Sequence, residues 1–92
     1  MNKYTAVVTV VGSDKPGIIA EVTGILAKEN VNICDISQTV VQDVFNMIML
    51  IDTTEAEISY EKLSEEFEKA EKELSCQIIL QKREVFSAMH RI

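Results

Sequence analysis

The stretch Gly12-Ser-Asp-Lys-Pro-Gly17 holds the residues best suited to bind a small charged molecule. Gly17 lets another group come close to the backbone, and the N–H groups at the start of a following helix attract a carboxylate. Asp14 could receive an ammonium group, so the stretch as a whole suits a free amino acid. The alternative is purely structural, with Asp14, Pro16 and Gly17 building a capped helix start that has Pro16 in its first turn.

The same stretch has the glycine spacing of a phosphate-binding loop without the chemistry of one. A Walker A loop needs Lys and then Ser or Thr after its second glycine, whereas Ile18 and Ile19 follow Gly17 here. Lys15 precedes that glycine and cannot reach round in the same way. The sequence therefore argues against nucleotide binding.

Catalytic and metal-binding residues have little support elsewhere in the chain. His90 is the one imidazole, and Cys34 and Cys76 lie too far apart for a zinc site or a redox pair. Because no Ser/His/Asp or Cys/His set can be assembled, we expect no enzyme, no metal and no cofactor. The two cysteines are expected to be buried thiols in a reducing compartment.

Length, composition and charge restrict the class of protein. The chain has 92 residues, 47% of them hydrophobic and 26% charged, which predicts one globular domain over residues 1–92. The net charge of −6 disfavours direct binding of nucleic acid. We find no apolar run long enough for a membrane span and no signal-type leader, so we expect a cytoplasmic protein without membrane contact.

Strand-like and helix-like patterns alternate along the chain. Tyr4–Val11 is rich in Val and Thr, which favours a strand. Apolar residues at helical spacing follow and predict a helix with Lys28 in its last turn. Asn30 is expected to end this helix in a left-handed conformation. Two further strands are nearly contiguous, which predicts a hairpin turning at Gln42-Asp43 and a bulge near Cys34-Asp35. The remaining predicted elements are the strands Val31–Asp43, Val44–Asp52 and Cys76–Val85, the helix Ser59–Ser75, and a tail or short helix over Phe86–Ile92.

The helix Ser59–Ser75 has a narrow apolar stripe and is otherwise strongly charged. Ser59 is a good N-cap. Glu65–Lys69 and Glu68–Lys72 have the i,i+4 spacing of supporting ion pairs. The simplest interpretation of the acidic run is a solvated helix face, with no cation site.

The order βαββαβ predicts the α+β ferredoxin-like sandwich, with a four-stranded antiparallel sheet and two helices on one face. The other face then lacks a cover. Val7, Val11, Ile48 and Leu50, or their neighbours of opposite parity, would be exposed there. A monomer seldom exposes so much apolar surface to water, so the sequence predicts a partner on this face. The simplest such partner is a second copy of the chain.

The chain resembles the ACT domain family along nearly its whole length, through Val8-x-Val10-x-Gly12-x-Asp14-x-Pro16-Gly17-Ile18-Ile19-Ala20 followed by Val31-Asn32-Ile33-x-Asp35-Ile36. It looks most like small bacterial and archaeal single-ACT-domain proteins, and like one half of the glycine-cleavage transcriptional repressor. The resemblance implies a non-catalytic regulatory domain that binds an amino acid at a homodimer interface. By position, the implied ligand contacts are Gly12, Ser13, Asp14, Lys15, Pro16, Gly17 and Ile18, with Asn32 from across the interface.

The chain departs from the common ACT pattern in one respect. ACT domains usually regulate an attached enzyme or DNA-binding domain, and this sequence contains neither. The resemblance therefore implies that the domain acts on a separate enzyme or regulator. Some ACT-type domains serve only as dimerisation modules, so a ligand-free protein-interaction module is the alternative.

Overall fold

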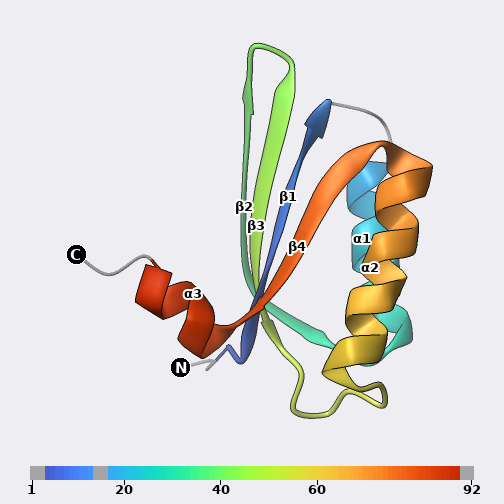
Figure 1. Ribbon diagram of the computed structural model, residues 1–92, viewed down its shortest axis with the longest axis vertical. Coiled ribbons are helices and arrows are strands. Elements are labelled where there is room, and N and C mark those ends of the chain that lie inside the picture. The colour runs from blue at the N-terminus through green and yellow to red at the C-terminus, as the bar shows by residue number, and fades with distance from the viewer. Residues whose placement is uncertain (1–3, 14–16, 90–92) are drawn as a thin grey trace.

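The computed structural model describes residues 4–13 and 17–89 (Figure 1). Four strands and three helices follow one another along this part of the chain. Their order confirms the predicted βαββαβ arrangement and adds a short helix after the last strand. The elements are β1 (Ala6–Ser13), α1 (Ile18–Lys28), β2 (Asn32–Val41), β3 (Val44–Asp52), α2 (Tyr60–Leu74), β4 (Cys76–Lys82) and α3 (Arg83–Met89).

The four strands form one antiparallel sheet in the order β2-β3-β1-β4. α1 and α2 lie together on one face of this sheet, and the short α3 lies on the other side (Figure 1). The fold is therefore the predicted ferredoxin-like sandwich. In the described part of the chain, no helix is long and apolar enough to cross a membrane.

The hydrophobic core lies between the sheet and the two long helices. Alternation along the strands sends one set of side chains toward the helices, as the sequence predicts for β1 and β3. The helices contribute the apolar stripes of their inner faces. The largest fully buried side chains of this core are Phe67, Ile18, Leu26, Met47, Met49, Ile51, Leu63, Val8, Val10 and Val22, whereas the equally buried Val7 lies on the opposite face of the sheet.

The helix starts differ from each other in how they are capped. α1 begins at Ile18 with Gly17 as its N-cap, and Pro16, which was predicted to lie in the first turn, is outside the described residues. Asp14, the predicted cap, lies outside the described residues. α2 begins as predicted, because the Ser59 hydroxyl accepts a hydrogen bond from the backbone N–H of Lys62 at 3.2 Å.

The hairpin between β2 and β3 has the predicted turn and the predicted bulge. Gln42 and Asp43 both adopt positive φ, as a two-residue hairpin turn of type I′ requires. The pairing shifts by one residue between Ile33 and Asp35, so that Cys34 is the extra residue. This shift lets Ile33 and Ile36, which have opposite parity, lie opposite the core residues Ile51 and Met49.

The end of the chain corrects two predictions. β4 ends at Lys82, three residues before the predicted Val85, and α3 begins at Arg83. The backbone N–H of Arg83 donates to the carbonyl of Thr5 at 2.9 Å, which anchors the turn. Val7 was expected to be exposed but is fully buried, because α3 packs across this end of β1 and β4.

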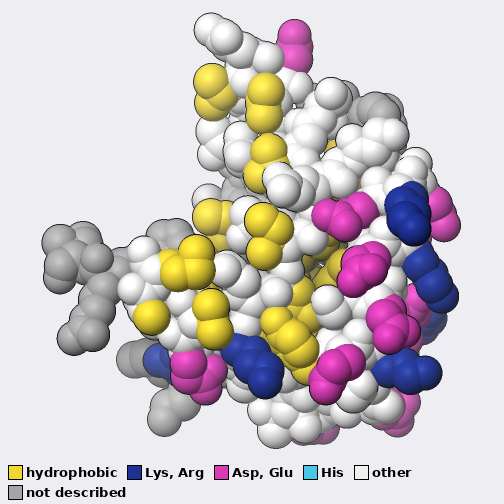
Figure 2. All heavy atoms as spheres, viewed as in Figure 1, with side chains coloured by type: hydrophobic (Ala, Val, Ile, Leu, Met, Phe, Trp, Pro, Cys, Tyr) yellow, Lys and Arg dark blue, Asp and Glu magenta, His cyan; other side chains and the backbone are white. Residues whose placement is uncertain are grey.

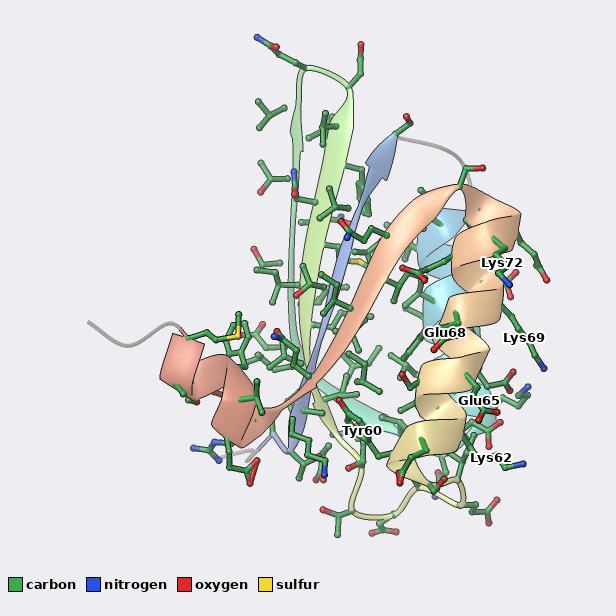
Figure 3. The ribbon with its side chains drawn as sticks, in the orientation of Figure 1. Tyr60, Lys62, Glu65, Glu68, Lys69 and Lys72 are labelled. Atoms are coloured by element: carbon green, nitrogen blue, oxygen red, sulfur yellow. The ribbon has the colours of Figure 1, made fainter. Side chains whose placement is uncertain are left out.

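Charged side chains gather on the helical side of the molecule, to the right in Figure 2. Lys62, Lys69 and Lys72 point from α2 toward solvent in Figure 3. Neither predicted pair, Glu65–Lys69 nor Glu68–Lys72, is among the ion pairs of residues 4–13 and 17–89. The ion pair between the two long helices joins Lys28 to Glu66, with Nζ and Oε1 2.8 Å apart.

Candidate functional site

Gly12 and Ser13 form the end of β1, where the predicted binding stretch begins. A Cβ atom on Gly12 would lie 2.6 Å from the Cβ atom of Cys76, so only glycine allows β4 to start this close to β1. The absence of a side chain at Gly12 is therefore explained by packing. Ser13 is exposed at the same end of the sheet, opposite Val44.

Gly17 is the N-cap of α1 and has a φ of 96°, a conformation that favours glycine. No atom lies within 4 Å of the position that a Cβ on Gly17 would take. The glycine therefore leaves open space at the positive end of the helix. A shallow hollow of about 440 Å³ continues from it along α1, lined by Gly17, Ala20, Glu21, Gly24, Ile25 and Lys28.

Ile18 contributes to this region only through its backbone. Its side chain is buried in the core, so it cannot meet a ligand from outside. Its backbone still belongs to the first turn of α1, where N–H groups point out of the helix. Asp14, Lys15 and Pro16, the centre of the predicted stretch, lie outside the described residues.

Asn32 lies at the opposite end of the sheet. It begins β2 and pairs with Asp52, whereas Gly12 pairs with Phe45 and Ser13 with Val44, beside the hairpin turn. Within one chain the structure therefore separates Asn32 from the Gly12–Ile18 region.

Asn32 lines a second, polar hollow of about 370 Å³ together with Asn30, Val31, Asp52 and Glu55. Hydrogen bonds donated by the hydroxyl and backbone N–H of Thr54 lower the pKa of Asp52. Asp52 and Glu55 were not among the residues predicted from the sequence. The hairpin could have revealed Asp52, because a turn at residues 42–43 and a one-residue bulge place residue 32 opposite residue 52.

The thiols and titratable side chains form no further reactive group in residues 4–13 and 17–89. Cys34 and Cys76 are both half-buried, where full burial was expected. In this part of the chain, no three His, Cys, Asp or Glu side chains are placed to hold a metal ion. His90 lies outside the described residues.

The described geometry defines the class of protein. The fold is a ferredoxin-like sandwich in which the first strand is followed by a helix that starts at a left-handed glycine. Within the described residues, the outer edges of β2 and β4 pair with no further strand, and α3 covers only part of the face opposite α1 and α2. The sequence model of the ACT domain matches residues 4–81. The chain belongs to the ACT domain family, a family of regulatory ligand-binding domains.

Individual relatives are similar over almost the whole chain. A UPF0237 protein of Methanopyrus kandleri is 53% identical over 87 residues, which cover 95% of this chain and 97% of that protein. The solved ACT domain protein from Streptococcus pneumoniae is 34% identical with a TM-score of 0.77 and 99% coverage of both chains. A solved glycine cleavage repressor-like protein shares the fold, with 22% identity, a TM-score of 0.66 and coverage of 86% of this chain and 45% of that one.

Proposed function

We propose that this protein is a non-catalytic regulatory domain that binds an amino acid at a homodimer interface and acts on a separate enzyme or regulator. The observation that carries the proposal is the left-handed Gly17 at the start of α1. Its open space and the adjacent helix N-terminus suit the carboxylate of an amino acid. The proposed contacts are Gly12, Ser13, Asp14, Lys15, Pro16, Gly17 and the backbone of Ile18.

The edge strand β2 supports a site shared between two copies. β2 has ten residues and only one of them, Asp35, is charged, so its free edge can pair with another strand. Two β2 edges related by a two-fold axis run antiparallel. Such pairing brings Asn32 of the second copy to the end of the joined sheet where Gly17 lies. The amide of Asn32 and the carboxylates of Asp52 and Glu55 then offer acceptors for the ligand's ammonium group.

The cellular setting follows from the same proposal. The free thiol of Cys34 suits a reducing compartment, and we place the protein in the cytoplasm. The target is a separate protein, because the family's regulatory role needs a partner that responds to the ligand. A dimerisation module without ligand is the second candidate, favoured by the exposed apolar side chains of Val40, Val41 and Val44 at the β2–β3 hairpin.

A thermal-shift screen against the free amino acids at about 10 mM tests the proposal. A ligand at about 100 times its Kd adds about 2.7 kcal/mol to the free energy of unfolding. Since about 1 kcal/mol raises the Tm of a small domain by about 4–8 °C, one or two amino acids should give a clear shift. A flat screen on folded homodimer would contradict ligand binding and favour the dimerisation module.

Two variants locate the site if a ligand is found. Gly17→Val should remove the ligand-induced shift, because a branched side chain fills the open space at the helix start. Asp43→Val also places Val at positive φ, in the hairpin turn, and controls for backbone strain. Asn32→Ala should weaken binding, whereas Gln38→Ala on the same strand should not. Equal affinity in wild type and Gly17→Val would overturn the site assignment.

A further inference from the structure

The strand β4 lies at one edge of the sheet, beside α2 (Figure 1), and side chains of α2 bond to its backbone. The Glu71 carboxylate accepts a hydrogen bond from the backbone N–H of Ile78, with Oε2 and N 2.7 Å apart. The Tyr60 hydroxyl donates to the backbone carbonyl of Leu80 at 2.8 Å. One donor and one acceptor near the middle of β4 are therefore occupied by side chains of the same chain.

The register of β4 shows that these two backbone groups point away from β1. In an antiparallel pair, residues that bond to the neighbouring strand alternate with residues whose N–H and C=O groups point outward. The N–H of Arg83 donates to the carbonyl of Thr5 at 2.9 Å, so residues 77, 79 and 81, which have the same parity, bond to β1. Ile78 and Leu80 therefore present their N–H and C=O groups to the outer edge, where an added strand would pair.

Tyr60 and Glu71 lie about three helical turns apart, so they project from the same face of α2. Figure 3 shows Tyr60 on the side of α2 that faces β4. Glu71 is half-buried, whereas most other glutamates of α2 are exposed. The other half-buried glutamate, Glu66, forms the ion pair with Lys28. The bond to β4 accounts for the burial of Glu71 as the ion pair accounts for that of Glu66.

A second contact fixes the ring of Tyr60 against β4. Nζ of Lys82 lies 5.1 Å from the centroid of this ring, within the range of a cation–π interaction. Burial and the charge of Glu61 raise the pKa of Tyr60, so its hydroxyl keeps the proton that it donates to Leu80. Lys82 is also exposed at the end of β4, and a lysine on an edge strand disfavours pairing with another chain.

We propose that Tyr60 and Glu71 close the β4 edge of the sheet to an added strand, and so determine which edge can accept a partner. A strand that paired with β4 would need the outward N–H and C=O groups of both Ile78 and Leu80. Tyr60 and Glu71 occupy one of the two groups at each of these residues. An incoming backbone would have to displace both side chains before it could pair.

Closing one edge limits how far the sheet can grow. Within residues 4–13 and 17–89, the side chain bonded to the backbone of β2, the opposite edge, is that of Asp35 in the strand itself, which accepts from the N–H of Ile36 at 2.9 Å. A sheet with two open edges can add copies on both sides without end, whereas a sheet with one open edge stops at a pair. α2 therefore protects the domain against open-ended association, whether or not a ligand binds at Gly17.

The double variant Tyr60→Phe/Glu71→Ala tests the proposal, because it removes both bonds but keeps the aromatic ring and a good helix former. In sedimentation of the full chain, its particle mass should be about twice that of wild type or more, and should rise with concentration. Glu71→Gln keeps an acceptor oxygen and should have the wild-type mass. Glu68→Ala removes the same charge from an exposed position of α2 and should also keep that mass.

Amide hydrogen exchange followed by NMR shows where the added strand pairs. The outward N–H of Leu80 should exchange about tenfold more slowly in the double variant than in wild type, because it bonds to the added strand. An unchanged mass in the double variant would overturn the proposal, and so would a larger mass without slower exchange at Leu80. If the double variant did not fold, unchanged masses in both Tyr60→Phe and Glu71→Ala would overturn it equally.

Discussion

The glycines of this domain illustrate how one residue type serves different purposes. Gly12 allows β1 and β4 to meet closely, and Gly17 adopts a left-handed conformation at a helix start. Gly24 lies inside α1, with no atom within 4 Å of a Cβ position and no positive φ. The sequence predicted the importance of Gly12 and Gly17 from their loop, but it could not assign Gly12 to packing against Cys76, because that contact joins distant parts of the chain.

Alanine substitutions at Gly12 and Gly24 should have opposite effects on stability. Gly12→Ala forces β4 to shift, and overpacking of this kind costs about 1–3 kcal/mol, so Tm should fall by about 4 °C or more. Gly24→Ala removes a flexible residue from a helix interior and should add about 0.5–1 kcal/mol. Thermal unfolding followed by circular dichroism measures both. A stable Gly12→Ala variant would show that the start of β4 moves easily.

The elements form where local patterns and tertiary contacts agree. The bounds of β3, the N-cap of α2, the hairpin turn and the bulge were all predictable, since each depends on residues close in sequence. The start of α1 and the end of β4 were not. α1 begins at the left-handed Gly17, and β4 ends where Arg83 bonds to Thr5, a contact between the two ends of the described chain.

The cap of α2 should be measurable by one substitution. Ser59→Ala removes the hydroxyl that accepts the N–H of Lys62, which should cost about 1 kcal/mol and lower Tm by about 4–8 °C. Ser64→Ala, inside the same helix, is the matched control and should be neutral or slightly stabilising because Ala is the better helix former. Equal Tm values for the two variants would mean that the cap contributes nothing to stability.

The ion pair between α1 and α2 should make stability depend on pH. The hydrogen bond and the charge of Lys28 lower the pKa of Glu66 below its usual 4.5. A lowered pKa stabilises the fold above the unfolded value, and this contribution disappears as the pH falls through the folded value. Glu66→Gln should therefore lose less stability than wild type between pH 7 and pH 3.

Urea unfolding at both pH values provides the measurement for this ion pair. Glu65→Gln is the control, because Glu65 is on the same helix and takes part in none of the ion pairs of the described residues. The control should follow the wild type at both pH values. If Glu66→Gln lost as much stability on acidification as the wild type, the Lys28–Glu66 pair would have no role in the acid sensitivity of the fold.

The whole molecule separates its surfaces by chemistry. One side carries the helices with most of the charged side chains, and the other carries α3 and a sheet face with few charged residues, Asp35 among them (Figure 2). The sequence predicted the uncovered face from the element order, but not the burial of Val7, since the docking of α3 is a tertiary contact. The candidate site was predictable only in part, because within one chain Asn32 lies at the opposite end of the sheet from the Gly12–Ile18 region.

The bulge at Cys34 has a consequence for how this sequence tolerates deletion. Side chains along a strand alternate with a period of two, and the extra residue resets the phase of that alternation for the rest of β2. Loss of a single codon at this position would leave the hairpin turn intact. It would also leave the pairing unchanged, because without Cys34 the pairs Ile33–Ile51 and Asp35–Leu50 follow one another directly, and every remaining side chain of β2 would keep its face. The start of β2 can therefore shorten by one residue at the bulge without moving any side chain between interior and surface.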